Sequence, residues 1–268
     1  MADADHRAAD RGTRASNYSA PALEKGFDVV ELLAAAPGGL TISEIALRLG
    51  ITISQIFRMI VVMERRGWLY KDRESDRYRV SYKVLDLAYR ATPAQELAYV
   101  ATPLMHSLAA QAEQSCHLVA KYGNQAIVLL RQESPRPVGL LVRLGTAVDL
   151  VASSSGHVLL AFSEPDDCEA TLASLQYPPN LSEADLRKAL TRVRKRGYEM
   201  MPSSRVTGVR DISRPVFGFD GRIAAALTIP FLAFIDGSQQ VNLEETEELL
   251  AETARRISEK LGCFPTAA

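Results

Sequence analysis

Ser153, Ser154 and Ser155 lie just before His157, and this cluster contains the residue types of a hydrolase. A serine hydrolase pairs a nucleophilic hydroxyl with a histidine base and a carboxylate, for which Asp211 is a candidate. The sequence has no Gly-x-Ser-x-Gly elbow, and a serine one to four residues from a histidine on one helix need not reach it. We therefore expect no enzyme and keep a hydrolase built on this cluster as the alternative.

The same small residues could instead bind a ligand. A helix is expected over Ser154–Phe162, so Ser154, Ser155 and Gly156 would lie in its first turn. Free backbone amides at a helix N-terminus attract anions, and small side chains let a ligand approach them. The alternative is ordinary N-capping by Ser153 or Ser154.

No cofactor or metal motif accompanies these residues. The sequence lacks a Walker loop, a Rossmann glycine pattern and a His-Glu-x-x-His motif. Its three cysteines, Cys116, Cys168 and Cys263, are far apart, which disfavours both a disulfide framework and a zinc site. We therefore expect no cofactor, no metal and a reducing, cytoplasmic location.

Composition and length indicate an ordinary globular chain. The 268 residues are 47% hydrophobic and 24% charged, with a net charge of −1, which excludes a disordered or fibrous protein and suits two domains. The longest nearly apolar stretch, residues 223–235, is too short to cross a bilayer. The first ten residues contain acids and no apolar segment, so neither a secretory signal nor a membrane partner is expected.

The N-terminal third predicts a helix-turn-helix. An amphipathic pattern from Pro21 predicts a helix that ends at Pro37. Capping boxes at Thr41–Glu44 and Thr52–Gln55 begin two further helices, and Gly50 suits the C-terminus of the first of these. Residues 69–80 read as two short strands around a charged turn, which predicts the hairpin of a winged helix-turn-helix.

Basic and polar residues lie where such a domain would contact DNA. Segment 54–90 has nine Lys or Arg against five Asp or Glu. The start of a recognition helix enters the major groove, where glutamine reads adenine and arginine reads guanine, whereas wing arginines contact phosphate. For Gln55 the capping box is an equal alternative, and a solvated hairpin would carry the same arginines. The candidate DNA contacts are Thr52, Ser54, Gln55, Arg58, Arg73, Arg77 and Arg79.

The C-terminal part alternates short apolar runs with helical patterns. Turn residues at 122–125 and 219–222 predict hairpins and hence a mainly antiparallel sheet. The expected strands are Ser115–Tyr122, Gln125–Gln132, Val138–Leu144, Val206–Phe217 and Arg222–Phe231. The expected helices are Ala94–Gln114, Ser154–Phe162, Pro165–Leu175, Ser182–Lys195 and Leu243–Leu261.

From about Pro21 to Leu261 the sequence resembles the IclR family of bacterial transcriptional regulators. The N-terminal match runs from ALEKGFDVVELL to GWLYKD, and the C-terminal matches are VASSSGHVLLAF and TGVRDISRPVFGFDGRIAAALTIPF. The sequence departs from the family at 53–58 of the recognition helix, at His157 in place of a usual lysine, and at Asp211, Arg214 and Pro230.

The resemblance implies an α+β protein with a winged helix-turn-helix, a linker helix and a GAF-like effector-binding domain. The expected segments are a disordered tail at 1–17, the DNA-binding domain at 18–82, the linker helix at 83–97 and the effector-binding domain at 98–268. It also implies a homodimer or tetramer on a palindromic double-stranded DNA operator, regulating a catabolic operon in response to a small organic effector.

Matching the family's pocket suggests which residues hold the effector, possible classes being an acid, an amide or a hydroxylated compound. A buried Asp211 needs a partner, so it would accept a hydrogen bond from a ligand hydroxyl or amine, or pair with a base such as Arg205 or Arg210. The candidate effector contacts are Leu140, Ser154, Ser155, Gly156, Val209, Asp211, Thr228 and Pro230.

Overall fold

The computed structural model describes residues 20–91, 94–179 and 181–264. The expected disordered tail at 1–17 lies outside these residues. The chain divides into two compact units with the boundary between Thr92 and Pro93.

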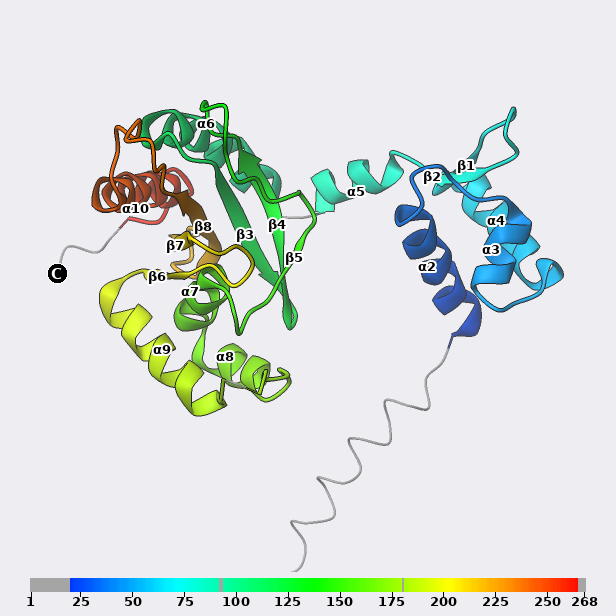
Figure 1. Cartoon of the computed structure of the whole chain (residues 1–268). Coiled ribbons are helices and arrows are strands. Elements are labelled where there is room, and N and C mark those ends of the chain that lie inside the picture. The colour runs from blue at the N-terminus through cyan, green and yellow to red at the C-terminus, as the bar shows by residue number, and fades with distance from the viewer. Residues whose placement is uncertain (1–19, 92–93, 180, 265–268) are drawn as a thin grey trace, which may run out of the picture. The chain divides into compact units, whose positions relative to one another are not determined.

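The first unit is a winged helix-turn-helix, as the sequence predicts (Figure 1). Its elements are α2 (Pro21–Ala34), α3 (Ile42–Arg48), α4 (Ile53–Arg65), β1 (Leu69–Lys71), β2 (Tyr78–Val80) and α5 (Lys83–Ala91). Both capping boxes form: the Thr41 amide donates to Glu44 at 2.8 Å, and the Thr52 amide donates to Gln55 at 3.1 Å. Each box satisfies backbone amides that a helix start leaves unpaired, so the two helices begin at defined residues.

The core of this unit holds the recognition helix α4 in place. Ile56 and Ile60 on α4 are fully buried, and they belong to one cluster with Ile45 of α3 and Leu69 of β1. The antiparallel pairing of β1 with β2 places Leu69 opposite Val80. The wing is therefore anchored to the same core as the recognition helix.

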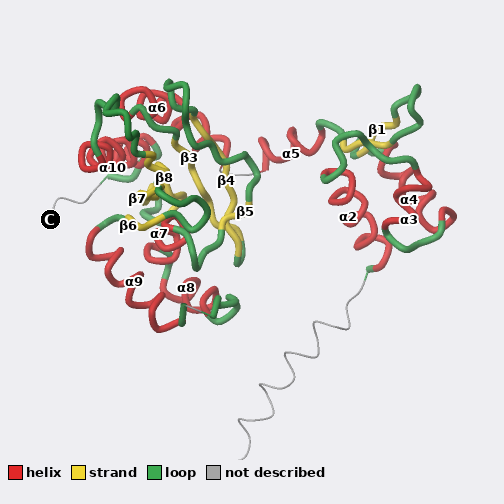
Figure 2. The backbone as a smooth tube through the Cα atoms, viewed as in Figure 1, coloured by secondary structure: helices red, strands yellow, loops and turns green. Residues whose placement is uncertain are grey.

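The second unit is built on a six-stranded sheet with the order β5-β4-β3-β8-β7-β6, in which every neighbouring pair is antiparallel (Figure 2). The strands are β3 (Cys116–Tyr122), β4 (Gln125–Gln132), β5 (Ala147–Val148), β6 (Glu199–Pro202), β7 (Val209–Phe217) and β8 (Ile223–Leu232). The helices are α6 (Ala94–Ala112), α7 (Ser154–Phe162), α8 (Pro165–Leu172), α9 (Glu183–Arg196) and α10 (Leu243–Lys260).

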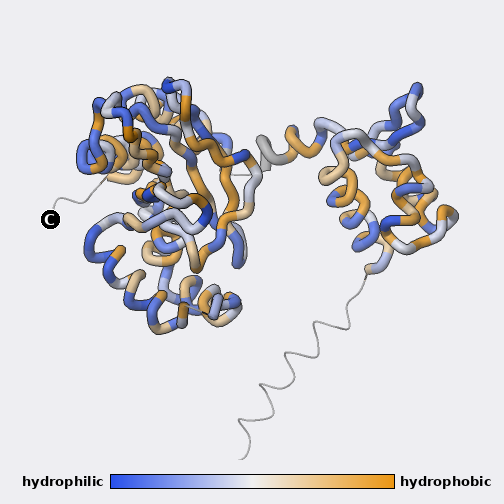
Figure 3. Tube along the Cα trace, viewed as in Figure 1, coloured by the Kyte–Doolittle hydropathy of each residue, from blue (hydrophilic) through white to orange (hydrophobic). Residues whose placement is uncertain are grey.

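The sheet is covered on both faces, and its central strands are accordingly apolar (Figure 3). Helices α6 and α10 pack on one face, where Met105, Ile257 and Leu118 of β3 belong to one buried cluster. Helix α7 covers the other face, where Leu160 and Val119 of β3 belong to one buried cluster, and α9 packs on α7. The mixed helix and antiparallel sheet confirm the expected α+β fold.

One strand prediction is wrong, and the two short edge strands β5 and β6 were not predicted. Residues 138–144 are a loop and not a strand, although they are rich in Val and Leu. Their apolar side chains pack against the buried cluster under α7 and line a cavity, as Val142 does. Strand β4 pairs instead with the short β5 at Ala147–Val148. The edge strand β6 was not expected, because Glu199–Pro202 has no alternating pattern.

The linker helix is shorter than expected. Helix α5 ends at Ala91, before Pro93, and residues 94–97 belong to α6.

Candidate functional site

The exposed face of α4 carries the residues expected to read DNA. Ser54, Gln55 and Arg58 are all exposed. The Gln55 Oε1 atom accepts the Thr52 amide, so part of this side chain is held in the capping box. The Thr52 and Ser54 hydroxyls lie 3.1 Å apart and also interact with each other. Among these residues Arg58 is the one whose head group has no protein partner in the described part of the chain.

The three wing arginines have different surroundings. Arg73 lies exposed in the turn between β1 and β2. Arg77 donates to the Gly39 carbonyl at 2.7 Å and to the Glu44 carboxylate at 3.0 Å, which ties the hairpin to α3. Arg79 is half-buried over Gly39, and its Nε atom is enclosed without a hydrogen-bond partner. Arg73 is thus the freest of the three to meet a phosphate.

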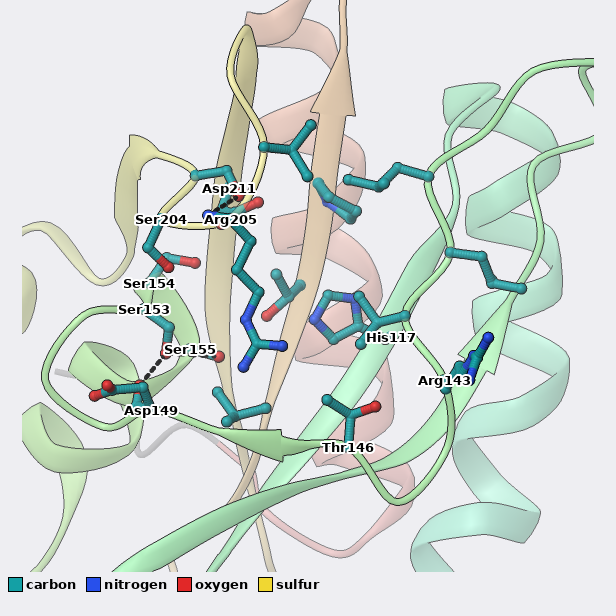
Figure 4. A pocket seen from close by; sticks show the side chains of 18 residues that line it. His117, Arg143, Thr146, Asp149, Ser153, Ser154, Ser155, Ser204, Arg205 and Asp211 are labelled. Carbon is teal, nitrogen blue, oxygen red and sulfur yellow. Dashed lines mark hydrogen bonds between the residues drawn. The ribbon is translucent and has the colours of Figure 1, made fainter. Parts of the chain in front are cut away.

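A cavity of about 290 Å³ opens on the α7 face of the C-terminal sheet (Figure 4). Six of the eight expected effector contacts line it: Leu140, Ser154, Ser155, Asp211, Thr228 and Pro230. They come from the 138–144 loop, the start of α7 and strands β7 and β8, so the tertiary structure brings together segments about 90 residues apart in the chain.

Gly156 and Val209 do not line this cavity. A Cβ atom on Gly156 would lie 2.5 Å from the Leu150 Cα atom, so glycine is required where α7 meets the preceding turn. Val209 shares a face of β7 with Asp211 but pairs with Leu232, whereas Asp211 pairs with Pro230. It is therefore one pleat farther along the strand, and its side chain is buried.

A chain of buried hydroxyls connects α7 to the floor of the cavity. The Ser154 and Ser213 hydroxyls lie 2.8 Å apart, and the Ser213 and Thr228 hydroxyls lie 2.7 Å apart. Three hydroxyls carry three protons and share two hydrogen bonds, so one proton is left over, and it lies on Thr228 or Ser154 when both bonds run in the same direction along the chain. Thr228 or Ser154 can therefore donate that proton to a group in the cavity. Ser213 was not among the expected contacts. It does not line the cavity itself and is connected to it through the Ser154 and Thr228 hydroxyls.

His117 on β3 lines the same cavity and was missed from the sequence. It pairs in register with Thr228, is 8% exposed, and its ring nitrogens have no hydrogen-bond partner among the described residues. Burial lowers the pKa of His117 to about 4, so the imidazole is neutral and presents one donor and one acceptor. The sequence feature that could have identified His117 is its position as a polar residue in the otherwise apolar first half of β3.

Charged side chains from β7 and from loops of the second unit also reach the cavity, and among them only Asp211 was expected to line it. Burial raises the pKa of Asp211, while a hydrogen bond from Ser203 and the charge of Arg205 oppose that rise. Arg205 extends into the cavity, and its Nη2 atom donates to the Ala147 carbonyl at 3.0 Å (Figure 4). Arg143 lies in the opposing loop. The cavity therefore offers both cationic and carboxylate groups to a ligand.

His157 is fully engaged in structural contacts. Its Nδ1 atom lies 2.9 Å from Glu199 Oε2, and its Nε2 atom lies 2.9 Å from the Val151 carbonyl oxygen. Burial alone would raise the pKa of Glu199, but His157, the Met200 amide and Arg192 hold it below its ordinary value. Both imidazole nitrogens are occupied, and no serine hydroxyl is among their partners.

The described parts of the chain show neither a metal-ligand cluster nor a single membrane-spanning helix. There, no three His, Cys, Asp or Glu side chains gather in a way that could hold a metal ion. No single helix there is long and apolar enough to cross a bilayer, and α3 and α4 meet that criterion only as a pair bent by 118°.

Known proteins resemble this chain over nearly its whole length. The family description "Bacterial transcriptional regulator IclR C-terminal" matches residues 89–259, and "IclR helix-turn-helix domain" matches residues 22–73. The HTH-type transcriptional repressor AllR of Klebsiella pneumoniae is 26% identical over 253 residues, which is 92% of each chain.

Solved structures show the same relationship. IclR of Thermotoga maritima is 25% identical with a TM-score of 0.66, over 90% of this chain and 98% of that one. An IclR homologue from Microbacterium hydrocarbonoxydans, complexed with 4-hydroxybenzoate, is 26% identical with a TM-score of 0.75, again over 90% and 98%.

The close approach at Gly156 yields a test of how α7 is seated. Gly156→Ala should lower the free energy of unfolding by about 3 kcal/mol, because the new methyl group meets backbone atoms that cannot rotate away. Denaturant titration followed by circular dichroism measures this. Gly218→Ala is the control: its one close Cβ neighbour is the Asp220 carboxylate at 3.2 Å, which can move, and the Arg222 carbonyl oxygen at 3.9 Å is in ordinary contact, so the loss should stay below about 1 kcal/mol. Equal losses would contradict the assignment.

The neutral state of His117 yields a pH test. The unfolded chain protonates this residue below its ordinary pKa of 6.5, whereas the folded chain does so only near 4. The stability from burying neutral His117 is present above pH 6.5 and lost as the pH falls toward 4. Between pH 7 and 4.5, wild type should lose about 2 kcal/mol more unfolding free energy than His117→Gln. The exposed His106→Gln variant should follow wild type, and identical curves for all three would disprove the buried neutral histidine.

Proposed function

We propose that this chain, which belongs to the IclR family of bacterial transcriptional regulators, binds an operator through its first unit and responds to a small organic effector in its second. The observation that carries this proposal is the cavity, where a neutral His117, which has no hydrogen-bond partner among the described residues, lies in the same lining as Asp211 and Arg205. Together these side chains offer a neutral donor and acceptor, a carboxylate and a cation to a small molecule, which is how ligand pockets orient polar groups.

The operator side of the proposal uses α4 and the wing. Ser54 and Arg58 face bases in the major groove, with Thr52 and Gln55 at the helix start, and the wing arginines contact phosphates. Arg73 is the foremost phosphate contact, since Arg77 is held by Glu44 and Arg79 is half-buried. The protein acts as a homodimer or tetramer on a palindromic operator of a catabolic operon.

The effector side uses the cavity. The relative with bound 4-hydroxybenzoate supports an effector that is an acid or a hydroxylated compound, and an amide is the further class. The carboxylate of an acid would lie at the α7 amides near Ser154 and Ser155, because helix N-termini favour anions. Asp211 would accept a hydrogen bond from a donor on the effector, which keeps its buried charge partnered.

Catalysis is not part of the proposed function. A hydrolase would need His157 to accept a proton from a neighbouring serine, but both of its ring nitrogens are occupied by Glu199 and the Val151 carbonyl. The relatives are transcriptional regulators, and we propose that this chain works in the cytoplasm without a cofactor or metal.

Operator binding is tested with a duplex enriched from a random DNA library by the full-length protein. Arg58→Ala should lose roughly 1–3 kcal/mol of discrimination at one base pair, because an arginine reads one guanine. Arg73→Ala should weaken all duplexes about equally and lower the salt dependence of binding, because phosphate contacts carry no sequence information. Fluorescence anisotropy measures both.

The control for this pair is Arg77→Ala. Since Arg77 holds the hairpin to Gly39 and Glu44, its loss should lower thermal stability as well as affinity. Enrichment of no sequence at all would disprove operator binding, and unchanged affinity and specificity in both Arg58→Ala and Arg73→Ala would place the interface elsewhere.

The role of Asp211 is tested by isothermal titration with 4-hydroxybenzoate and benzoate. Wild type should prefer the hydroxylated acid, because its hydroxyl can donate to Asp211, which otherwise repels a simple anion. Asp211→Asn should reduce that preference by removing the charge while keeping an acceptor. The exposed Asp166→Asn variant serves as the control and should retain it. The same ligand ranking in wild type and Asp211→Asn would mean that Asp211 is purely structural.

A further inference from the structure

The recognition helix α4 exposes a row of large apolar side chains that the proposed polar contacts do not explain. Ile53, Phe57 and Val61 are 47%, 53% and 41% exposed, and they follow one another at intervals of four residues. Such spacing places them in successive turns along one side of the helix. A single exposed phenylalanine on a protein surface needs no explanation. Three aligned apolar side chains on the helix proposed to read DNA indicate a contact surface.

Helix geometry shows which of these residues face away from the core. At about 100° per residue, Val61 lies with Ser54 and Arg58 on the side opposite the buried Ile56 and Ile60. Phe57 lies next to that side and one turn before Val61. The face presented to a partner therefore combines the Arg58 guanidinium with the Phe57 ring and the Val61 methyl groups.

The polar readers on this face are few. Gln55 is partly withdrawn, because its Oε1 atom accepts the Thr52 amide in the capping box. The Ser54 hydroxyl lies 3.1 Å from the Thr52 hydroxyl. Arg58 is thus the one long polar side chain on the first two turns that has no protein partner among the described residues, and Phe57 is its direct neighbour.

The chemistry of the major groove limits what an apolar side chain can read there. Among the four base pairs, the thymine C5-methyl is the apolar group displayed in that groove, and phenylalanine is one of the side chains that contact it. We propose that Phe57, with Val61 beside it, reads the C5-methyl of a thymine adjacent to the base read by Arg58. The inference rests on the proposed operator binding and adds a specificity-determining residue to it.

A second protein would be a poorer occupant of this face. Arg58 and Arg65 lie on the same side of α4, and neither forms an ion pair within the described residues. An apolar protein contact would bury these cations without partners, which is costly. A DNA groove instead supplies phosphates and guanine acceptors for the arginines and methyl groups for the apolar side chains.

The experiment removes single methyl groups from the DNA. The probe is the duplex that the full-length wild-type protein enriches from a random library, with each thymine replaced in turn by deoxyuridine, which lacks only the C5-methyl. At one or more positions next to the guanine read by Arg58, wild type should bind the uracil duplex about fourfold more weakly, the factor expected for one buried methyl. Fluorescence anisotropy at fixed salt gives the dissociation constants.

The variants assign the effect to Phe57. Phe57→Ala should bind the thymine and uracil duplexes equally at that position, and Phe57→Leu should keep part of the preference. Leu47→Ala is the matched control, because Leu47 is an exposed apolar residue of α3, in the same unit but off the recognition helix. It should retain the full fourfold effect.

Three results would overturn the inference. Wild type could bind every uracil duplex as tightly as its thymine parent, a measurement that needs no variant. Phe57→Ala could keep the thymine preference while folded by circular dichroism, or could change only the oligomeric state in sedimentation, which would assign Phe57 to a protein contact. All three presuppose an enriched sequence, so they are distinct from a failure of operator binding itself, in which no sequence is enriched.

Discussion

The close approach of α7 to the turn before it is the constraint on which the effector cavity depends. Gly156 has no side chain, so the helix can start directly against the backbone of Asp149 and Leu150. That position brings Ser154 within 2.8 Å of Ser213 on the sheet, and the hydroxyl chain then continues to Thr228. A helix displaced by a single methyl group would break this chain and move its free amides away from the cavity. Packing at one glycine thus sets the geometry of several polar groups.

The polar interior of the second unit is divided between groups that are satisfied and groups that are not. His157 and Glu199 satisfy each other deep beside α7, with Val151 and Arg192 completing their hydrogen bonds. These contacts join α7 to β6, and they leave neither imidazole nitrogen of His157 free to bind a ligand. His117, on β3, has no such partner among the described residues although it is nearly as buried. Its neutral ring can therefore donate one hydrogen bond to a ligand in the cavity and accept another.

In the DNA-binding unit, residues that look like readers also hold the structure. Gln55 completes the capping box of α4, and Arg77 joins the wing to Glu44 of α3. Backbone and carboxylate partners within the protein compete with DNA for these side chains. On the first two turns of α4, Arg58 and the apolar Phe57 remain available for base contacts, so specificity is expected to combine one guanidinium contact with methyl contacts.

The amino-acid sequence by itself determined the local elements and the family. Capping boxes at Thr41 and Thr52, the turn residues at 122–125 and the helix pattern after Ser153 act over a few residues, and the structure places helices and hairpins there. Only the tertiary structure decided that His117 faces the cavity, that Arg205 crosses into it and that Gly156 lies against backbone. These facts depend on contacts between β3, β8, α7 and the loop before β7, and no short-range pattern encodes which distant strands become neighbours. The strand expected at 138–144 is a loop, because Val and Leu are favoured both in a paired strand and in a loop that packs its side chains inward. Local sequence does not distinguish these two environments.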